Sequence, residues 1–332
     1  MNIAIVGCGA IAHTHATSIF NIGGNNLVAF ADIRLDRAEE FSKKFGGKAY
    51  SSLEEMIEME KIHVLHICTP HYLHTAMALY ALELGVHVFM EKPPVISKEQ
   101  LSQLEQIHSN ARLGFCFQNR YNPSVIKVKE MLSNNELGSI LGVRGILTWN
   151  RPLEYYKKSD WRGRLETEGG GVLINQAIHT MDLMQYFIGD KPVSVDAMIT
   201  NHHLKDEIEV EDTMSAWIQY PKLNACFYAT SAYCKNSAPL IELECEKGTI
   251  RLEDMVVTYY EPDGTVNSIP IERKVGYGKS YWGAGHEDCI RDFYRCITNE
   301  QRFPQDLDGI KQTIELMLAA YESGRTHQVI YL

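Results

Sequence analysis

Short apolar runs alternate with stretches of helical periodicity over the first 118 residues of this 332-residue chain. This alternation is typical of βαβ units, which build a parallel sheet covered by helices. Strands are expected at 3–7, 27–32, 64–68, 86–90 and 113–118. Helices are expected at 35–45, 52–58, 74–85 and 97–109. The pattern therefore predicts a doubly wound α/β domain over residues 1–119.

From residue 120 onward, longer runs alternate apolar and polar residues, which is typical of a largely antiparallel sheet. Strands are expected at 140–148, 193–201, 213–220, 225–233 and 240–245, with turns at Lys247-Gly248 and Asp263-Gly264. Helices are expected at 172–187, 287–298 and 309–323. Because a domain takes roughly 150 residues, the length fits two domains, the second spanning 120–332.

Composition excludes several classes of protein. Hydrophobic residues make up 45% of the chain and charged residues 22%, as in globular and not in disordered or fibrous proteins. A formal net charge of -10 argues against nucleic-acid or anionic-membrane partners. No run reaches the roughly 18 apolar residues of a membrane span, and the N-terminus lacks the basic region of a secretory signal. We expect a cytosolic protein.

The eight cysteines are dispersed without a Cys-x-x-Cys pair, and most lie within apolar runs. That usage is typical of buried thiols in a reducing compartment, so neither a disulfide nor a zinc site is expected. His71 and His74 have a spacing that metal ligands use, but no cysteine or acidic cluster accompanies them. Contact with a cofactor is the preferred interpretation of this pair.

Residues Gly7 to Ala12 fit the pattern Gly-x-Gly-x-x-Ala between an expected strand and helix. Gly7 permits a tight turn, Gly9 lets the backbone approach a pyrophosphate, and Ala12 allows close helix packing. The helix N-terminus then offers amide donors and a favourable dipole to phosphate. Such glycine turns are common, so the motif needs support from residues further along the chain.

Asp32 gives that support, because it ends the next strand 20 residues after Ala12. A carboxylate there accepts hydrogen bonds from ribose hydroxyls and repels a 2′-phosphate, which favours NAD. Arg34 and Arg37 lie close enough to weaken this preference, so NADP stays open. The alternative is a solvated carboxylate at a strand end.

Lys92 lies at the same edge of the predicted sheet, where open α/β sheets bind ligands. Glu91, Lys92 and Pro93 follow strand 86–90, and the segment 69–74 follows strand 64–68. A lysine in isolation is more often a surface residue. Beside a nicotinamide, Lys92 would act on a substrate hydroxyl, and burial would lower its pKa toward the working range.

A second group of polar residues lies on the expected helix 172–187, after Gly169-Gly170-Gly171. The triple glycine lets another surface approach closely. Asn175, His179 and Asp182 share one face of an α-helix, and polar groups on a buried helix are costly without partners. A site is therefore expected in which His179 reaches the substrate and Asp182 orients its imidazole, or has a structural role only.

Taken in order, these motifs resemble the Gfo/Idh/MocA family of NAD(P)-dependent oxidoreductases. The matching segments are GCGAIAHTH (7–15), TPHYLH (69–74), EKP (91–93), QNRYNP (118–123), DWRG (160–163), GGGVLINQAIH (169–179), VEDT (210–213) and GHEDCIRDFY (285–294). They cover nearly the whole chain. The resemblance implies a Rossmann domain, then an α/β domain whose large open sheet often forms dimers or tetramers. It also implies a C-terminal segment packed on the first domain.

The resemblance makes Lys92 the catalytic lysine and His179 the residue that binds or deprotonates the substrate hydroxyl. It places around the cofactor Gly7, Gly9, Ile11, Ala12, Asp32, Arg37, Thr69, His74, Glu91, Lys92 and Arg120. It places near the substrate Asn175, His179, Trp161 and Arg162, with Asp182 in support and no metal. Inositol-dehydrogenase-like members carry aspartate where this chain has Asn175, whereas members acting on nucleotide-linked sugars carry a similar Asn-Gln pair.

The expected reaction oxidises a secondary alcohol of a sugar, polyol or nucleotide sugar. The hydroxyl proton passes to Lys92 or His179, and hydride passes to the nicotinamide of NAD or NADP. Two other functions stay open. One is a redox-assisted glycoside hydrolase, which releases sugar without accumulating NADH. The other is a ligand or NAD sensor on the same fold. The expected oligomer is a homodimer or homotetramer.

Overall fold

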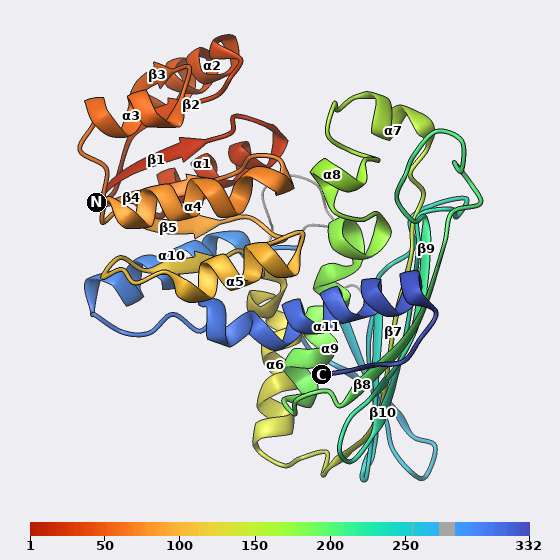
Figure 1. Ribbon diagram of the computed structural model, residues 1–332. Coiled ribbons are helices and arrows are strands. Elements are labelled where there is room, and N and C mark those ends of the chain that lie inside the picture. The colour runs from red at the N-terminus through yellow and green to blue at the C-terminus, as the bar shows by residue number, and fades with distance from the viewer. Residues whose placement is uncertain (254, 272–282) are drawn as a thin grey trace. The chain divides into compact units, whose positions relative to one another are not determined.

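The computed structural model describes residues 1–253, 255–271 and 283–332 (Figure 1). The chain forms two compact units. Unit 1 comprises Met1–Tyr121 with Val275–Gly309, and unit 2 comprises Asn122–Lys274 with Ile310–Leu332. Among the described helices, none has both the length and the apolar character that crossing a bilayer requires.

Unit 1 contains a six-stranded parallel sheet with the order β3-β2-β1-β4-β5-β6. The strands are β1 (Asn2–Val6), β2 (Asn26–Ala31), β3 (Lys48–Tyr50), β4 (Val64–Ile67), β5 (His87–Met90) and β6 (Leu113–Phe115). This order is the doubly wound Rossmann arrangement, which confirms the predicted fold class. The sequence pattern missed β3, whose three residues do not form part of an apolar run.

Helices cover the unit 1 sheet: α1 (Ala10–Ile22), α2 (Leu35–Phe45), α3 (Leu53–Met59), α4 (His74–Glu83), α5 (Lys98–Gln106) and α10 (His286–Thr298), with short 3-10 turns at His71–Leu73 and Gln118–Tyr121. Serine caps begin two of them, since Ser52 accepts from the Glu55 N–H and Ser97 from the Gln100 N–H. The late helix α10 packs against α1 within this unit. Its Phe293 joins the core residues Ile3, Ile5 and Phe89.

Unit 2 contains a nine-stranded sheet with the order β14-β13-β12-β11-β7-β10-β9-β8-β15. The strands are β7 (Ile140–Thr148), β8 (Ser194–Thr200), β9 (Thr213–Gln219), β10 (Asn224–Thr230), β11 (Leu240–Cys245), β12 (Gly248–Glu253), β13 (Val256–Tyr260), β14 (Val266–Ile269) and β15 (Ile330–Tyr331). Every pair is antiparallel except β7 with β10, so the prediction of a mainly antiparallel sheet is confirmed.

The helices of unit 2 are α6 (Pro123–Ser133), α7 (Leu153–Lys157), α8 (Leu165–Glu168), α9 (Ile178–Ile188) and most of α11 (Leu307–Thr326). α9 packs closely on β7, because Gly145 in that strand leaves space for Met184 and Thr180. The expected continuous helix 172–187 is wrong in one respect. Leu173–Ala177 form a π-helical turn that precedes α9, and a π-turn shifts the register of the side chains.

Candidate active site

The two glycines of the unit 1 loop differ: the backbone requires a glycine at Gly7, whereas at Gly9 it would accept other residues. Gly7 follows β1 with a φ of 85°, and a Cβ there would lie 2.7 Å from the backbone carbon of Cys68. Gly9, the N-cap of α1, has an ordinary φ of -87° and open space where its Cβ would be. Packing does not explain a glycine at position 9, whereas the approach of a pyrophosphate to the helix N-terminus does.

Asp32, in the loop after β2, lies against this glycine loop. Its Oδ2 accepts the Cys8 N–H at 2.8 Å and its Oδ1 accepts the Arg34 N–H at 2.9 Å. The carboxylate thus ties the loop after β1 to the loop after β2. The Arg34 guanidinium pairs with Asp36 at 2.7 Å, and Arg37 is exposed. A carboxylate at the position of Asp32 can accept hydrogen bonds from the adenosine ribose of a dinucleotide.

His74, expected at the cofactor, has both ring nitrogens against backbone carbonyls. Nε2 lies 2.8 Å from the carbonyl oxygen of Thr69, and Nδ1 lies 2.8 Å from that of Pro93. The imidazole therefore links the residue after β4 to the segment after β5, where Lys92 lies. This contact makes His74 a support for the loop that carries Lys92, which is half-buried.

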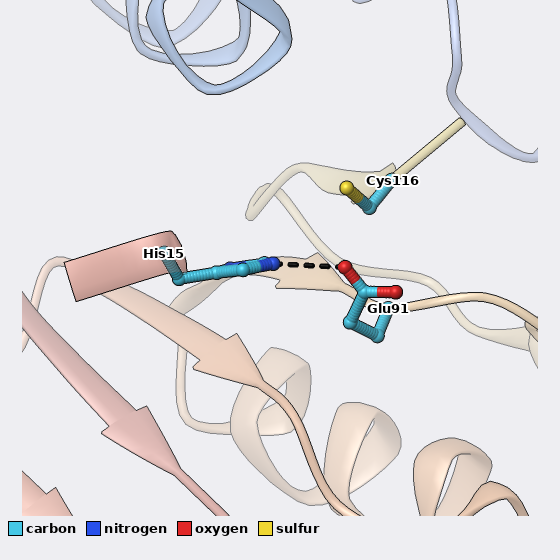
Figure 2. Close-up of side chains that lie close together, drawn as sticks. All are labelled: His15, Glu91 and Cys116. Carbon is cyan, nitrogen blue, oxygen red and sulfur yellow. Dashed lines mark hydrogen bonds and ion pairs between the residues drawn. The ribbon is translucent and has the colours of Figure 1, made fainter. Parts of the chain in front are cut away.

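Glu91 turns its carboxylate into the interior of unit 1, where His15 of α1 meets it (Figure 2). His15 Nε2 and Glu91 Oε1 are 2.8 Å apart, and Glu91 Oε2 accepts the Lys92 N–H at 3.2 Å. Burial alone would raise the pKa of Glu91, but the hydrogen bond and charge of His15 hold it well below its usual range. Sequence reasoning missed His15, although it belongs to the quoted segment 7–15.

Of the described residues, one cluster has the composition of a metal site: His15, Glu91 and Cys116 (Figure 2). Their ligand atoms lie within 4.8 Å of one another. Tetrahedral zinc separates a bound nitrogen and oxygen by about 3.4 Å. The 2.8 Å contact between His15 and Glu91 instead fits a direct hydrogen bond that shares a proton.

Arg120 lies in the 3-10 turn Gln118–Tyr121 of unit 1 and contacts Gly309 at the start of α11. Its Nη1 donates to the carbonyl oxygen of Gly309 at 3.2 Å, and its guanidinium lies 5.9 Å from the Phe117 ring centre. Ile11 and Ala12 lie in the first turn of α1, Ala12 fully buried, as close helix packing requires.

In unit 2, Asn175 and His179 are the two residues of the stretch 170–185 that are not buried. They lie four positions apart in an otherwise buried helical segment, Asn175 in the π-turn and His179 in the first turn of α9, which fits the predicted site. Asp182, expected on the same face, is buried and accepts the Thr313 hydroxyl at 2.8 Å. The π-turn breaks the simple α-helical count on which the shared face of all three residues depended.

Asn175 is held by a carboxyl that sequence reasoning left without a role. Its amide donates to Glu168 Oε1 and to the Tyr155 hydroxyl, the latter at 3.3 Å. Glu168 also accepts the Gly163 N–H. Burial raises the pKa of Glu168 to about 7, against the opposing effect of these donors. An acidic group that titrates near neutrality therefore lies beside Asn175.

Tyr155 is the centre of an aromatic and cationic group in unit 2. The Arg162 guanidinium lies 4.5 Å from the Tyr155 ring centre and 5.0 Å from that of Trp161. Arg151, which the sequence analysis did not single out, lies 5.1 Å from the same Tyr155 ring. The structure thus brings Trp161, Arg162 and Asn175 together through Tyr155.

Glu211, in the segment VEDT, supports the glycine-rich start of the π-turn. Its carboxylate accepts the N–H groups of Gly171 at 2.7 Å and Leu173 at 3.1 Å, and the Tyr321 hydroxyl at 2.8 Å. A Cβ on Gly171 would overlap the Glu211 carbonyl oxygen, and one on Gly170 would overlap Tyr321. The prediction that the triple glycine allows close approach is confirmed.

Family models match both parts of the chain. Residues 1–114 match the oxidoreductase family with an NAD-binding Rossmann fold, and residues 125–251 match the GFO/IDH/MocA C-terminal domain. Among curated relatives, glucose-6-phosphate 3-dehydrogenase of Bacillus subtilis (strain 168) is 35% identical over 63% of this chain and 60% of its own. D-glucoside 3-dehydrogenase of Escherichia coli (strain K12) is 30% identical over 57% of this chain and 54% of its own. The matches thus span less than two thirds of these relatives.

A solved structure extends the similarity over the whole chain. The WlbA dehydrogenase from Bordetella pertussis, in complex with NADH and UDP-GlcNAcA, superposes with a TM-score of 0.86 at 27% identity, covering 100% of this chain and 98% of that one. With two matched models that together exceed half of the chain, the protein belongs to the Gfo/Idh/MocA family of oxidoreductases, and its residues 1–114 are the family's NAD-binding Rossmann domain.

Proposed function

We propose that the protein is an NAD-dependent dehydrogenase that oxidises a secondary alcohol of a sugar or sugar derivative. The observation that carries this proposal is the carboxyl edge of the unit 1 sheet. The loop after β1 carries Gly9, where a Cβ would meet open space, and the loop after β5 carries Lys92. Both loops begin at this edge. A dinucleotide and a titratable amine then meet where open α/β sheets bind ligands.

NAD, when bound, supplies the hydride acceptor. The chain's own residues manage the proton. The Lys92 amine takes the substrate hydroxyl proton, and its ammonium form stabilises negative charge that develops on that oxygen. His179, half-buried on α9 of unit 2, has an imidazole that can bind a substrate hydroxyl or take its proton.

We infer a hydroxyl-rich substrate for the unit 2 residues. Tyr155 and Trp161 offer flat ring faces, Arg162 offers N–H donors, and Asn175 offers an amide, a combination that suits the apolar face and hydroxyls of a sugar. The named relatives act on glucose 6-phosphate and D-glucosides, and WlbA was crystallised with a nucleotide sugar. A nucleotide sugar is therefore included among the candidate substrates.

We propose that the protein assembles as a homodimer or homotetramer through the outer face of the unit 2 sheet. Trp217 of β9, 55% exposed, pairs across strands with Cys226, and Met198 of β8, 61% exposed, pairs with Ser215. Tyr228 of β10, 38% exposed, also pairs with Ser215. Outward apolar side chains on neighbouring strands are typical of a surface covered by a partner. Sedimentation of wild type against Trp217→Glu tests this.

The test of the activity follows NADH absorbance when the purified protein and NAD meet a panel of inositols, free sugars, glycosides and nucleotide sugars. Lys92→Ala is the control, expected to lose most turnover while keeping its affinity for NAD. Comparable turnover in this variant would refute the role of Lys92. Sugar released from glycosides without NADH would support a redox-assisted hydrolase. NAD binding without any turnover would support a sensor.

A further inference from the structure

A chain of buried polar side chains extends from Glu91 into unit 1, away from the groups so far given a role. His15 Nδ1 lies 2.8 Å from His66 Nδ1, and His66 Nε2 lies 2.7 Å from the Tyr294 hydroxyl. With Glu91, these residues come from α1, β4, α10 and the end of β5. His15 and His66 are fully buried, so each hydrogen bond lies in a medium of low dielectric.

The hydrogen bonds fix where the protons are when His15 is charged. Both ring nitrogens of an imidazolium donate, so His15 donates to Glu91 Oε1 and to His66 Nδ1. His66 then accepts on Nδ1 and donates from Nε2 to the Tyr294 oxygen. In this state both ring nitrogens of His15 and both of His66 have a hydrogen-bond partner, with one cation and one anion.

The neighbouring groups support the same assignment. Burial lowers the pKa of His15, but hydrogen bonds with Cys116 and Glu91 outweigh it and raise the value to about 9. Burial, together with the His15 charge, holds the pKa of His66 well below its usual range. Burial also lowers the pKa of His286 to about 4, so His286 is neutral at pH 7, and burial lowers the pKa of His74.

Next to Lys92 lies a carboxylate whose charge His15 offsets. The Lys92 charge acts on Glu91, His286 and His74, and among these the ionised Glu91 carboxylate has the opposite charge. Glu91 also holds the Lys92 N–H. An uncompensated Glu91 would favour the ammonium form of Lys92, and the His15 cation moderates that effect.

We propose that His15 is a positioning residue, which holds the Glu91 carboxylate beside Lys92 and offsets its negative charge, and thereby sets how readily Lys92 gives up its proton. The proposal rests on the proposed role of Lys92 in proton transfer. It concerns this chain's own groups, so it is testable on the free protein without a substrate.

The experiment measures the pKa of Lys92 in the free protein by competitive labelling. Trace acetic anhydride reacts with neutral amines, so the labelled fraction of each lysine peptide, followed by mass spectrometry across pH, reports its titration. Exposed lysines such as Lys222 serve as internal references. The variants are His15→Gln, Glu91→Gln and, as the matched control on the same helix, His13→Gln, whose histidine is exposed.

Two opposite shifts are expected. His15→Gln leaves Glu91 without its cation and raises the pKa of Lys92 by about one pH unit, whereas Glu91→Gln lowers it by a similar amount. His13→Gln leaves it unchanged. Shifts in the same direction, or changes within about 0.3 pH unit in both variants, would overturn the proposal. A purely structural role gives no reason for opposite signs.

A second measurement covers the case in which the variants do not fold. Nitrogen-15 NMR of the wild-type histidine rings distinguishes an imidazolium from a neutral tautomer. His15 is expected to carry protons on both nitrogens at pH 7 and to lose one near pH 9. A neutral His15 at pH 7 would overturn the proposal whatever the activity of the protein. Failure of the NADH assay with a charged His15 would count against the proposed function only.

Discussion

The amide of Asn175 donates to the buried carboxyl of Glu168, seven residues earlier in the chain. Asn175 occupies the position that the sequence comparison with inositol-dehydrogenase-like enzymes marked as a departure, from aspartate to asparagine. In this protein an amide meets a carboxyl there, so the local carboxyl comes from Glu168. A second carboxyl at position 175 would repel it.

Asn175→Asp is therefore expected to make the free energy of unfolding depend more strongly on pH. The folded pKa of Glu168 is about 7 against an ordinary value of 4.5, so the folded state binds the proton more tightly than the unfolded chain. The contribution of Glu168 to stability is fully present below about pH 4.5 and is lost as pH rises through 7. A second carboxyl raises the folded pKa further and deepens this loss.

Urea unfolding at pH 5.5 and 8.5 measures the effect. Asn175→Asp should cost about 1–3 kcal/mol more at the higher pH than at the lower one. Asn224→Asp, at an exposed position of the same unit, should cost the same at both. Equal costs for Asn175→Asp at the two pH values would show that Glu168 does not retain its proton.

Gly7 and Gly9 should respond differently to alanine. Gly7→Ala forces a positive φ and a clash with the Cys68 backbone, so the melting temperature of the free protein should fall sharply. Gly9→Ala meets open space and an ordinary φ, so the fold should tolerate it. Its methyl group should lower the affinity for NAD by about tenfold or more in calorimetric titration. Unchanged affinity in Gly9→Ala would contradict the position assigned to the pyrophosphate.

Asp32→Asn should relax the preference between the two dinucleotides. The amide keeps the shape of the side chain but removes the charge that repels a 2′-phosphate. The ratio of NADP to NAD affinity should rise by about tenfold, measured by calorimetry with both cofactors. Glu39→Gln, an exposed charge removal on α2, controls for net charge. An equal rise in the control would assign the effect to the overall field.

Tyr321→Phe should destabilise unit 2. The hydroxyl of Tyr321 donates to Glu211 at 2.8 Å and accepts the Ile174 N–H at 3.1 Å, and all three groups are buried. Losing both partners should cost about 1–3 kcal/mol in urea unfolding. Tyr331→Phe, at a residue that is 77% exposed, should change stability little. Similar values for the two variants would mean that water replaces the lost hydroxyl.

Local pattern was sufficient for most of the unit 1 elements. Strand and helix positions follow from periods of two and about 3.6 residues, which neighbouring side chains encode without reference to distant parts of the chain. The loop at Gly7 and the acid at Asp32 also follow from the chain order, since consecutive βα units place both at one sheet edge. The short strand β3 and the π-turn at Leu173–Ala177 leave no such signal.

Sequence alone determined the fold class, the family and the residue types at the expected site. Tertiary structure decided which buried polar groups meet: His66 hydrogen-bonds Tyr294 across 228 positions, and Tyr321 reaches Glu211 across 110. The hydrophobic period and the residue propensities of a segment indicate which face of a helix or strand is buried, but not which other element packs against that face. A buried carboxyl such as Glu91 or Glu168 acquires its charge state from that partner, so its chemistry is fixed only when the elements pack.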